Sequence, residues 1–271
     1  VYDRTGKYST AWAYDILQDK KGRLWMASYQ GGVFVMDKAS LLAGKTVADY
    51  HFSDQGKNAL SGLHVGQMVM DGKGRIWVST FNRLDCINPY DMKVVHVTNS
   101  GVVNYMMADS KGNIWVGDNS SVKCYYAAGE IKGSNFGSKE WKIGCKVSTM
   151  CDVDGKIWVV TGNECCVISH EGESMRFVIP SITPFTIYYS KSTHEVVMGG
   201  NDGFVEIRSD VVLSPKKLNQ LILAGIVVNG KPWDERSEKL VLKSDENSFI
   251  LHLTDLPFAD HPSAVYAYKL E

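Results

Sequence analysis

The chain has 271 residues, of which 44% are hydrophobic, 11% aromatic and 22% charged, and its formal net charge is −1. This apolar content supports a folded core and excludes wholesale disorder, while the near-neutral charge argues against a nucleic-acid-binding surface. No apolar run reaches the roughly 18 residues that would indicate a membrane span. The sequence starts at Val1 without a basic and apolar leader, so we expect a fragment or a processed product.

One short motif recurs along the chain. "DKKGRLWMAS" begins at Asp19, "DGKGRIWVST" at Asp71, "DSKGNIWVGD" at Asp109 and "DVDGKIWVVT" at Asp152. The shared pattern is D-x-x-G-x-[IL]-W-[VM], with tryptophans 52, 38 and 43 residues apart, and a degenerate fifth copy places Val196 at the Trp position. Four matching copies indicate a repeat architecture.

Each repeat contains several short apolar stretches separated by polar turns. In the first repeat, "AYDILQD" precedes the motif and "GGVFVMD" follows it, and the other repeats show the same order. Strands of four to six residues and a period near 40 are typical of a β-propeller blade, a four-stranded antiparallel sheet. No helical periodicity is sustained, so the sequence predicts an all-β fold with five propeller blades.

The motif residues are interpreted as structural. D-x-x-G predicts a turn between the first and second strands, in which Asp bonds the backbone and Gly adopts a positive φ. The Trp on the second strand then fills the wedge between blades, and its burial contributes at most about 4–6 kcal/mol. The residues with these roles are Asp19, Gly22, Trp25, Asp71, Gly74, Trp77, Asp109, Gly112, Trp115, Asp152, Gly155 and Trp158.

Six cysteines occur, and none forms a C-x-x-C pair. Cys86 and Cys124 both lie nine residues after a motif Trp, a place that Phe34 and Val205 hold in other copies, and Cys151 directly precedes its turn Asp. We therefore expect these cysteines to be small buried apolar residues. Equivalent positions in neighbouring blades should be too far apart for disulfides.

The stretch "NALSGLHVGQMVMDGKGRIWVST", residues 58–80, resembles the two-component regulator propeller repeat, N-x-L-S…V…D-x-x-G-x-[IL]-W-[VI]-G-T. "GRLWMASYQGGVFVMD" matches that pattern as well, including its Gly31-Gly32 pair, which the second to fourth repeats lack. The resemblance implies that the five repeats are the C-terminal part of a seven-bladed propeller, although closure as five blades is the alternative. An incomplete ring would leave blade faces exposed.

The repeat stops after residue 217. "LILAGIVVNGKPW" and "AVYAYKLE" then resemble the opening of the Tyr-rich (Y_Y_Y) β-sandwich that follows such propellers, with Tyr266 and Tyr268 in its Y-x-Y-x-L-E motif. The expected domains are therefore propeller repeats in 1–217 and the first strands of an immunoglobulin-like β-sandwich in 218–271.

The resemblance implies a periplasmic sensor region of a hybrid two-component system of Bacteroidetes, the ectodomain of an inner-membrane histidine kinase. Such a region would bind an oligosaccharide released from a glycan and pass the signal through the sandwich. Implied partners are the oligosaccharide, the remaining blades and sandwich strands of the same protein, and a second copy in a homodimer. Neither catalysis, nor a cofactor, a metal or nucleic acid is expected in this fragment.

Ligand is expected on the propeller face opposite the D-x-x-G turns. There the loops after the Trp strands meet the segments that lead into each first strand, and they carry aromatic, amide, carboxylate and Arg side chains, a combination that suits sugars. The candidates are Tyr29, Gln30, His64, Phe81, Asn82, Arg83, Asp118, Asn119, Asn163, Glu164, Asn201 and Asp202. The lead-in segments also hold Trp12, Asn104 and Phe185, of which Trp12 is alternatively a core residue.

Two other function classes remain open. A propeller lyase would need a His or Lys base with an acid or metal across the channel, but none of the seven histidines stands in an H-x-x-x-H or H-E-x-x-H pattern, and no G-x-S-x-G occurs. A scaffold that binds only proteins would show a broad apolar face rather than a polar and aromatic funnel.

Overall fold

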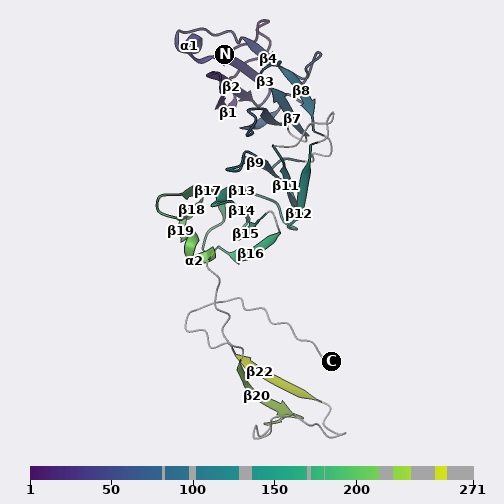
Figure 1. The fold of residues 1–271 in the computed structure, drawn as a ribbon, viewed down its shortest axis with the longest axis vertical. Coiled ribbons are helices and arrows are strands. Elements are labelled where there is room, and N and C mark those ends of the chain that lie inside the picture. The colour runs from purple at the N-terminus through teal and green to yellow at the C-terminus, as the bar shows by residue number, and fades with distance from the viewer. Residues whose placement is uncertain are drawn as a thin grey trace. The chain divides into compact units, whose positions relative to one another are not determined.

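Short antiparallel strands make up most of the described chain (Figure 1). The computed structural model describes residues 1–80, 83–97, 102–127, 136–169, 172–179, 181–213, 222–232 and 248–254. By the packing of the backbone they form two units, Val1–Val212 and Leu213–Glu271. The division falls five residues before the boundary expected from the end of the repeat.

The first unit holds five sheets, which we call blades 1 to 5, each formed by strands in consecutive order. Blade 1 consists of β1 (Ala13–Gln18), β2 (Arg23–Ser28), β3 (Gly32–Asp37) and β4 (Tyr50–Phe52). Blade 2 consists of β5 (Val65–Met70), β6 (Ile76–Thr80), β7 (Arg83–Asn88) and β8 (Lys93–His96). Blade 3 consists of β9 (Tyr105–Ala108), β10 (Ile114–Gly117), β11 (Ser121–Tyr125) and β12 (Ser138–Lys142).

Blade 4 consists of β13 (Thr149–Val153), β14 (Lys156–Thr161), β15 (Glu164–Ile168) and β16 (Glu173–Val178). Blade 5 shows three strands in its described residues, β17 (Pro184–Ser190), β18 (Glu195–Gly200) and β19 (Gly203–Arg208). The first strands of successive blades pack against one another, β1 on β5, β5 on β9, β9 on β13 and β13 on β17. The all-β propeller architecture expected from the repeat is confirmed.

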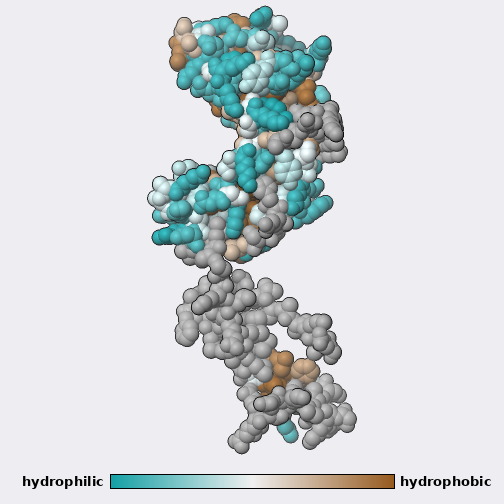
Figure 2. All heavy atoms as spheres, viewed as in Figure 1, coloured by the Kyte–Doolittle hydropathy of each residue, from teal (hydrophilic) through white to brown (hydrophobic). Residues whose placement is uncertain are grey.

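Two helices of five residues, which the sequence did not predict, follow blade strands: α1 (Lys38–Leu42) after β3 and α2 (Ser209–Leu213) after β19. None of the helices in the described part of the chain could span a bilayer. The α1 segment and the chain start lie over blade 1, where Val1, Tyr8 and Leu41 pack against buried Met26 and Phe34. Figure 2 shows a mostly hydrophilic surface on this unit, with hydrophobic residues near α1.

The second unit has one described sheet, in the order β21-β20-β22: β20 (Ile222–Val228), β21 (Lys231–Pro232) and β22 (Phe249–Thr254). Phe249, Ile250 and Leu251 of β22 are exposed large hydrophobic residues. Tyr266 and Tyr268 lie outside the described residues, so the sandwich remains a prediction.

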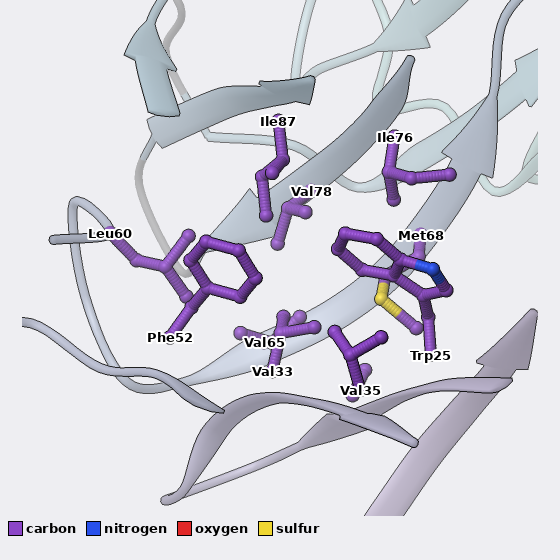
Figure 3. Packing of buried hydrophobic residues seen from close by; sticks show 11 residues of the cluster. Trp25, Val33, Val35, Phe52, Leu60, Val65, Met68, Ile76, Val78 and Ile87 are labelled. Atoms are coloured by element: carbon purple, nitrogen blue, oxygen red, sulfur yellow. The ribbon is translucent and has the colours of Figure 1, made fainter. Parts of the chain in front are cut away.

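The motif tryptophans fill the space between neighbouring blades, as expected. Trp25 is fully buried and lies between Val33 and Val35 of its own blade and Met68 and Ile76 of blade 2 (Figure 3). Trp77 packs in the same way against blade 3, and Trp115 packs against blade 4. In blades 1 to 3, one indole therefore joins each sheet to the next.

A carboxylate, buried in the first two motifs and half-buried in the third, fixes each of the first three indoles, a contact not expected from the sequence. Asp19 accepts from the backbone N–H groups of Lys21 and Arg23 with Oδ1, both at 2.9 Å. Its Oδ2 accepts from the indole Nε1–H of Trp25 at 2.9 Å and pairs with the Arg23 guanidinium. Burial alone would raise the pKa of Asp19, but the bonds from Trp25 and Arg23 outweigh it and lower the pKa. The same ionised carboxylate therefore closes the turn and fixes the indole that lies between the blades.

The second and third motifs repeat this geometry. Asp71 accepts from Trp77 Nε1–H and Asp109 from Trp115 Nε1–H, each at 2.9 Å. The motif glycines at all three turns have φ between +79° and +82°. The residue after the glycine also reaches the next blade, because the Arg23 guanidinium donates to Pro89 O at 2.7 Å.

The fourth motif departs from the other three although it matches the same pattern. Val153 pairs with Lys156, so only Asp154 and Gly155 form the turn, both at positive φ, as in a type I′ hairpin. Removing one turn residue shifts the first strand by one position. Val153, fully buried, takes the place of the carboxylate, and the indole Nε1–H of Trp158 has no hydrogen-bond partner among the described residues.

The strand registers correct two alignments drawn from spacing alone. Cys151 lies opposite Trp158, where Leu17, Val69 and Met107 lie in the other blades, and not before the turn Asp. Val35, rather than Phe34, lies opposite Trp25, because the extra glycine in that loop displaces the strand by one residue. Similarly, Ile207 rather than Val205 lies opposite Val196. Spacing cannot distinguish these registers, since a one-residue slip preserves the motif.

The D-x-x-G turns contact each other along one face of the unit. Gly72 N–H donates to Gly112 O at 3.0 Å, and Ser110 N–H donates to Asp152 Oδ2 at 2.6 Å. In blade 5 the Tyr189 hydroxyl donates to Asp154. Bonds between turns therefore link blade 2 to blade 3 and blade 3 to blade 4, and a bond from strand β17 to the turn of blade 4 links blade 4 to blade 5.

The outward faces of the first and fifth blades expose apolar side chains. Ile16 of β1, 62% exposed, lies between Asp15 and Leu17, which face blade 2, so its own side chain faces away from blade 2. Tyr188 of β17, 67% exposed, likewise adjoins Tyr189, which contacts blade 4. Such faces need cover, and further blades as their cover remain a prediction.

A tryptophan pair tests the bond between indole and carboxylate. Trp77→Phe removes the N–H that Asp71 accepts, whereas Trp158→Phe removes an N–H without an acceptor. We expect W77F to lower the free energy of unfolding by about 1.5–3 kcal/mol more than W158F, as for a hydrogen bond to a charged group. Urea denaturation of both variants measures the difference. Equal losses would show that the bond adds no stability.

A glycine pair tests the contact between turns. Gly112 and Gly155 have φ of +79° and +81°, but an added Cβ would lie 2.4 Å from Gly72 Cα at Gly112 and would meet no atom within 4 Å at Gly155. Both Ala variants carry left-handed strain of about 1–2 kcal/mol. We expect G112A to lose about 1–3 kcal/mol more through the clash, measured by thermal unfolding. A G155A variant as unstable as G112A would contradict this assignment.

Candidate functional site

The loops after the Trp strands and the segments that lead into first strands share one face, opposite the D-x-x-G turns. Tyr29 N–H donates to Trp12 O at 3.0 Å in blade 1, and Asn104 N–H donates to Gly117 O at 2.9 Å in blade 3. At the junction of blades 4 and 5, Asn163 of the β14–β15 loop lines one pocket together with Ser181, Ile182 and Thr183 of the segment before β17. The expected meeting of the two sets of segments is therefore present at three places.

An aromatic cluster lies where blade 1 meets blade 2 on this face. Its centre is Tyr29, with ring centroids 6.1 Å from Trp12, 5.4 Å from Tyr14 and 4.8 Å from His64. Trp12 and Tyr14 are exposed, so Trp12 is not a core residue. Tyr14 was not predicted from the sequence. It lies two residues after Trp12, at the start of β1, and this position near the lead-in segment could have identified it. Exposed ring faces of this kind suit the apolar face of a sugar ring.

A second site is a cavity of about 240 Å³ between blades 4 and 5. It brings together two predicted residues, Asn163 from the β14–β15 loop and Asp202 from the β18–β19 loop. The segment leading into β17 supplies the other lining residues, Ile179, Ser181, Ile182 and Thr183. The sequence predicted that this segment lies on the ligand face. The residue it indicated there was Phe185, which does not line the cavity.

Asp118 occupies the same kind of loop in blade 3, yet the loop itself uses its carboxylate. Oδ1 accepts from the backbone N–H groups of Ser120 and Ser121, and Oδ2 accepts from the Ser121 hydroxyl at 2.7 Å. Burial opposes ionisation, but the bonds from Ser121 and Ser120 outweigh it and lower the pKa of Asp118. Asp118 therefore shapes its loop and has little remaining capacity for a ligand.

Other predicted residues fall into three groups. Two are bonded to neighbours: Asn119 accepts from Asn104 Nδ2–H at 2.9 Å, and Glu164 pairs with Arg176 at 3.3 Å. Three are exposed without a side-chain hydrogen bond to another described residue: Gln30, Arg83 and Asn201. Phe81 and Asn82 lie outside the described residues.

Ser61, Asp85 and His96 lie together, but not as a catalytic triad. The fully buried Asp85 carboxylate accepts from the Ser61 backbone and hydroxyl, both at 2.7 Å. His96 directs the same atom, Nδ1, at Asp85 and at Ser61. A triad requires the two ring nitrogens to contact the carboxylate and the nucleophile separately. The group instead ties the segment before β5 to β7 and β8.

Four of the six cysteines, Cys86, Cys124, Cys165 and Cys166, are buried. Burial raises the pKa of the Cys86 and Cys124 thiols to about 12 and that of Cys151 to about 11. All six cysteines are free, and only Cys145 is exposed. The expectation for Cys86 and Cys124 is confirmed, and their protonated thiols are poor nucleophiles.

Comparison with known proteins supports the propeller interpretation. Residues 7–30 match the profile of the two-component regulator propeller family. Among curated proteins, none matches this sequence. Among solved structures, the extracellular domain of BT4673 from B. thetaiotaomicron, described as part of a hybrid two-component system in one structure and of a one-component system in another, is 26% identical with a TM-score of 0.68.

The BT4673 match covers 94% of this chain but only 36% to 37% of the BT4673 structure, so the chain spans about a third of that relative. The extracellular domain of BT3049, described as a hybrid two-component system of the same organism, is 19% identical with a TM-score of 0.65, covering 89% of this chain and 35% of that structure. A chain of the mitotic checkpoint complex, 11% identical with a TM-score of 0.54, covers 71% of this chain and 62% of its own length. The last two show a shared fold only.

Two aspartates in equivalent loops test whether the Asp118 carboxylate stabilises its loop and the Asp202 carboxylate does not. Asp118→Ala removes three hydrogen bonds and should lower the free energy of unfolding by about 1–3 kcal/mol, whereas Asp202→Ala should change it by less than about 0.5 kcal/mol. Urea denaturation near neutral pH measures both. Because the pKa of Asp118 is lowered, its stabilisation is complete above pH of about 4 and is lost on acidification. D118A should therefore differ less from the parent in acid, and an unchanged difference would refute this role.

Proposed function

We propose that this chain is a sensor module outside the cytoplasm that binds a glycan-derived oligosaccharide and signals through its C-terminal β unit toward a membrane histidine kinase. The observation that carries the proposal is the match to the extracellular domain of BT4673 over 94% of the chain. The propeller supplies the ligand face, and the second unit connects it to the rest of the receptor.

The chemistry of the face supports a saccharide. The aromatic cluster around Tyr29 offers exposed ring faces for stacking, and the cavity at Asn163 and Asp202 offers amide and carboxylate groups for hydroxyl groups. Apolar rings with a few convergent polar groups are typical of small-molecule sites. Signalling then requires that ligand binds one arrangement of the receptor better than another. A periplasmic location and a homodimer belong to the same proposal.

Calorimetry with the 271-residue chain tests the proposal. The probes are oligosaccharides released from plant, fungal and host polysaccharides, titrated one class at a time. We expect one class to bind, and saturating ligand at 100 times Kd should stabilise the fold by about 2.7 kcal/mol. Binding by no class would contradict the sensor proposal. Release of unsaturated sugar products on incubation would favour a lyase instead.

A further inference from the structure

We propose that the cavity between blades 4 and 5 is a subsite for an uncharged, hydroxyl-rich sugar unit, and that it disfavours sulfated and carboxylated sugars. The inference rests on the proposed function and adds the substrate class. The cavity measures about 240 Å³, several times the roughly 30 Å³ that one water molecule occupies in the liquid. It can therefore hold part of a ligand and not only solvent.

The floor and the rim of the cavity differ in chemistry. Ile179 and Ile182 are buried and form the apolar part, whereas Asn163, Thr183 and Asp202 are exposed and supply polar groups. Little of either isoleucine side chain is accessible, so the accessible lining of the cavity is mainly polar. A sugar carries hydroxyl groups at its edge, and these would lie against the rim.

The polar rim groups are not used by the protein. Asn163, Ser181, Thr183 and Asp202 make no side-chain hydrogen bond to another described residue. The equivalent loop of blade 3 gives the contrast, since the Asp118 carboxylate is occupied by three donors of its own loop. Loops at one topological position thus have either an occupied or an available carboxylate. In the part of these loops that the structure describes, Asp202 of blade 5 combines an available carboxylate with a cavity.

The backbone around the cavity is held in a defined conformation. Ser181 has φ of +68°, an uncommon state for a residue with a side chain, and such strain often marks functional sites. The segment also lies directly on β18, because an added Cβ at Gly200 would approach Thr183 O to 2.7 Å. Together with the bond from Ile179 N–H to Asn163 O, these contacts place the rim groups before any ligand arrives.

The charge of the lining sets the preference. Asp202 is the one charged side chain among the residues that line the cavity. A carboxylate accepts strongly from neutral hydroxyl groups, with about twice the strength of a neutral acceptor, but it repels a sulfate or uronate brought to the same place. An uncharged sugar therefore satisfies the site, and an anionic sugar does not.

The test is calorimetry of the 271-residue chain with two sets of probes. The uncharged set contains xylo-, manno-, cello- and arabino-oligosaccharides, and the anionic set contains oligogalacturonides and heparin and chondroitin sulfate disaccharides. We expect binding from the uncharged set only. Asp202→Ala should weaken that binding at least about tenfold, the loss of one hydrogen bond to a charged group. Lys191→Ala, an exposed residue of the β17–β18 turn on the opposite face of the unit, should leave the affinity unchanged.

The outcomes separate this inference from the proposed function. Equal or tighter binding of the anionic set, or an affinity that D202A leaves unchanged, would overturn the subsite while the sensor proposal stands. No binding from either set would overturn both. Circular dichroism of D202A and K191A shows whether each variant keeps the fold of the parent, so a loss of affinity is assigned to the site.

Discussion

The hydrogen bond from a tryptophan indole to a turn carboxylate is the interaction on which the first three blades depend. One oxygen of Asp19, Asp71 or Asp109 closes the turn, and the other fixes the indole that fills the space toward the next blade. Local chain reversal and packing between sheets are thereby set by one side chain. Because the indole is buried without exposure to water, its N–H would otherwise lack a partner.

Much of the fold could be predicted because the repeat reports on burial and turns, which are local properties. The period, the strand order and the wedge role of Trp25 and its equivalents all follow from residue type and spacing. The register of blade 4 could not be predicted, since "DVDG" satisfies the motif either as a longer turn or as a two-residue hairpin. Only the pairing of Val153 with Lys156 distinguishes them, and that pairing depends on which side chain the core accepts.

The candidate site was predictable as a face and not as a set of contacts. Topology alone places the loops of Tyr29 and Asn163 on the side opposite the turns, and the structure brings each of them beside a lead-in segment. Whether a polar residue is available depends on the few residues around it. Asp118 is followed by two serines that bond it, whereas Asp202 is followed by Gly203 and Phe204, and Asp202 remains available.

The chain of bonds between D-x-x-G turns gives the two faces of the unit different freedom to change during evolution. On the turn face, Gly72, Gly112 and Asp152 are in direct contact with a neighbouring blade, so a substitution there is transmitted to the next repeat. On the opposite face, loops such as those of Asn201 and Asp202 bear little of the folding free energy. A lineage can therefore diversify what it recognises, loop by loop, at little cost to the scaffold that holds those loops.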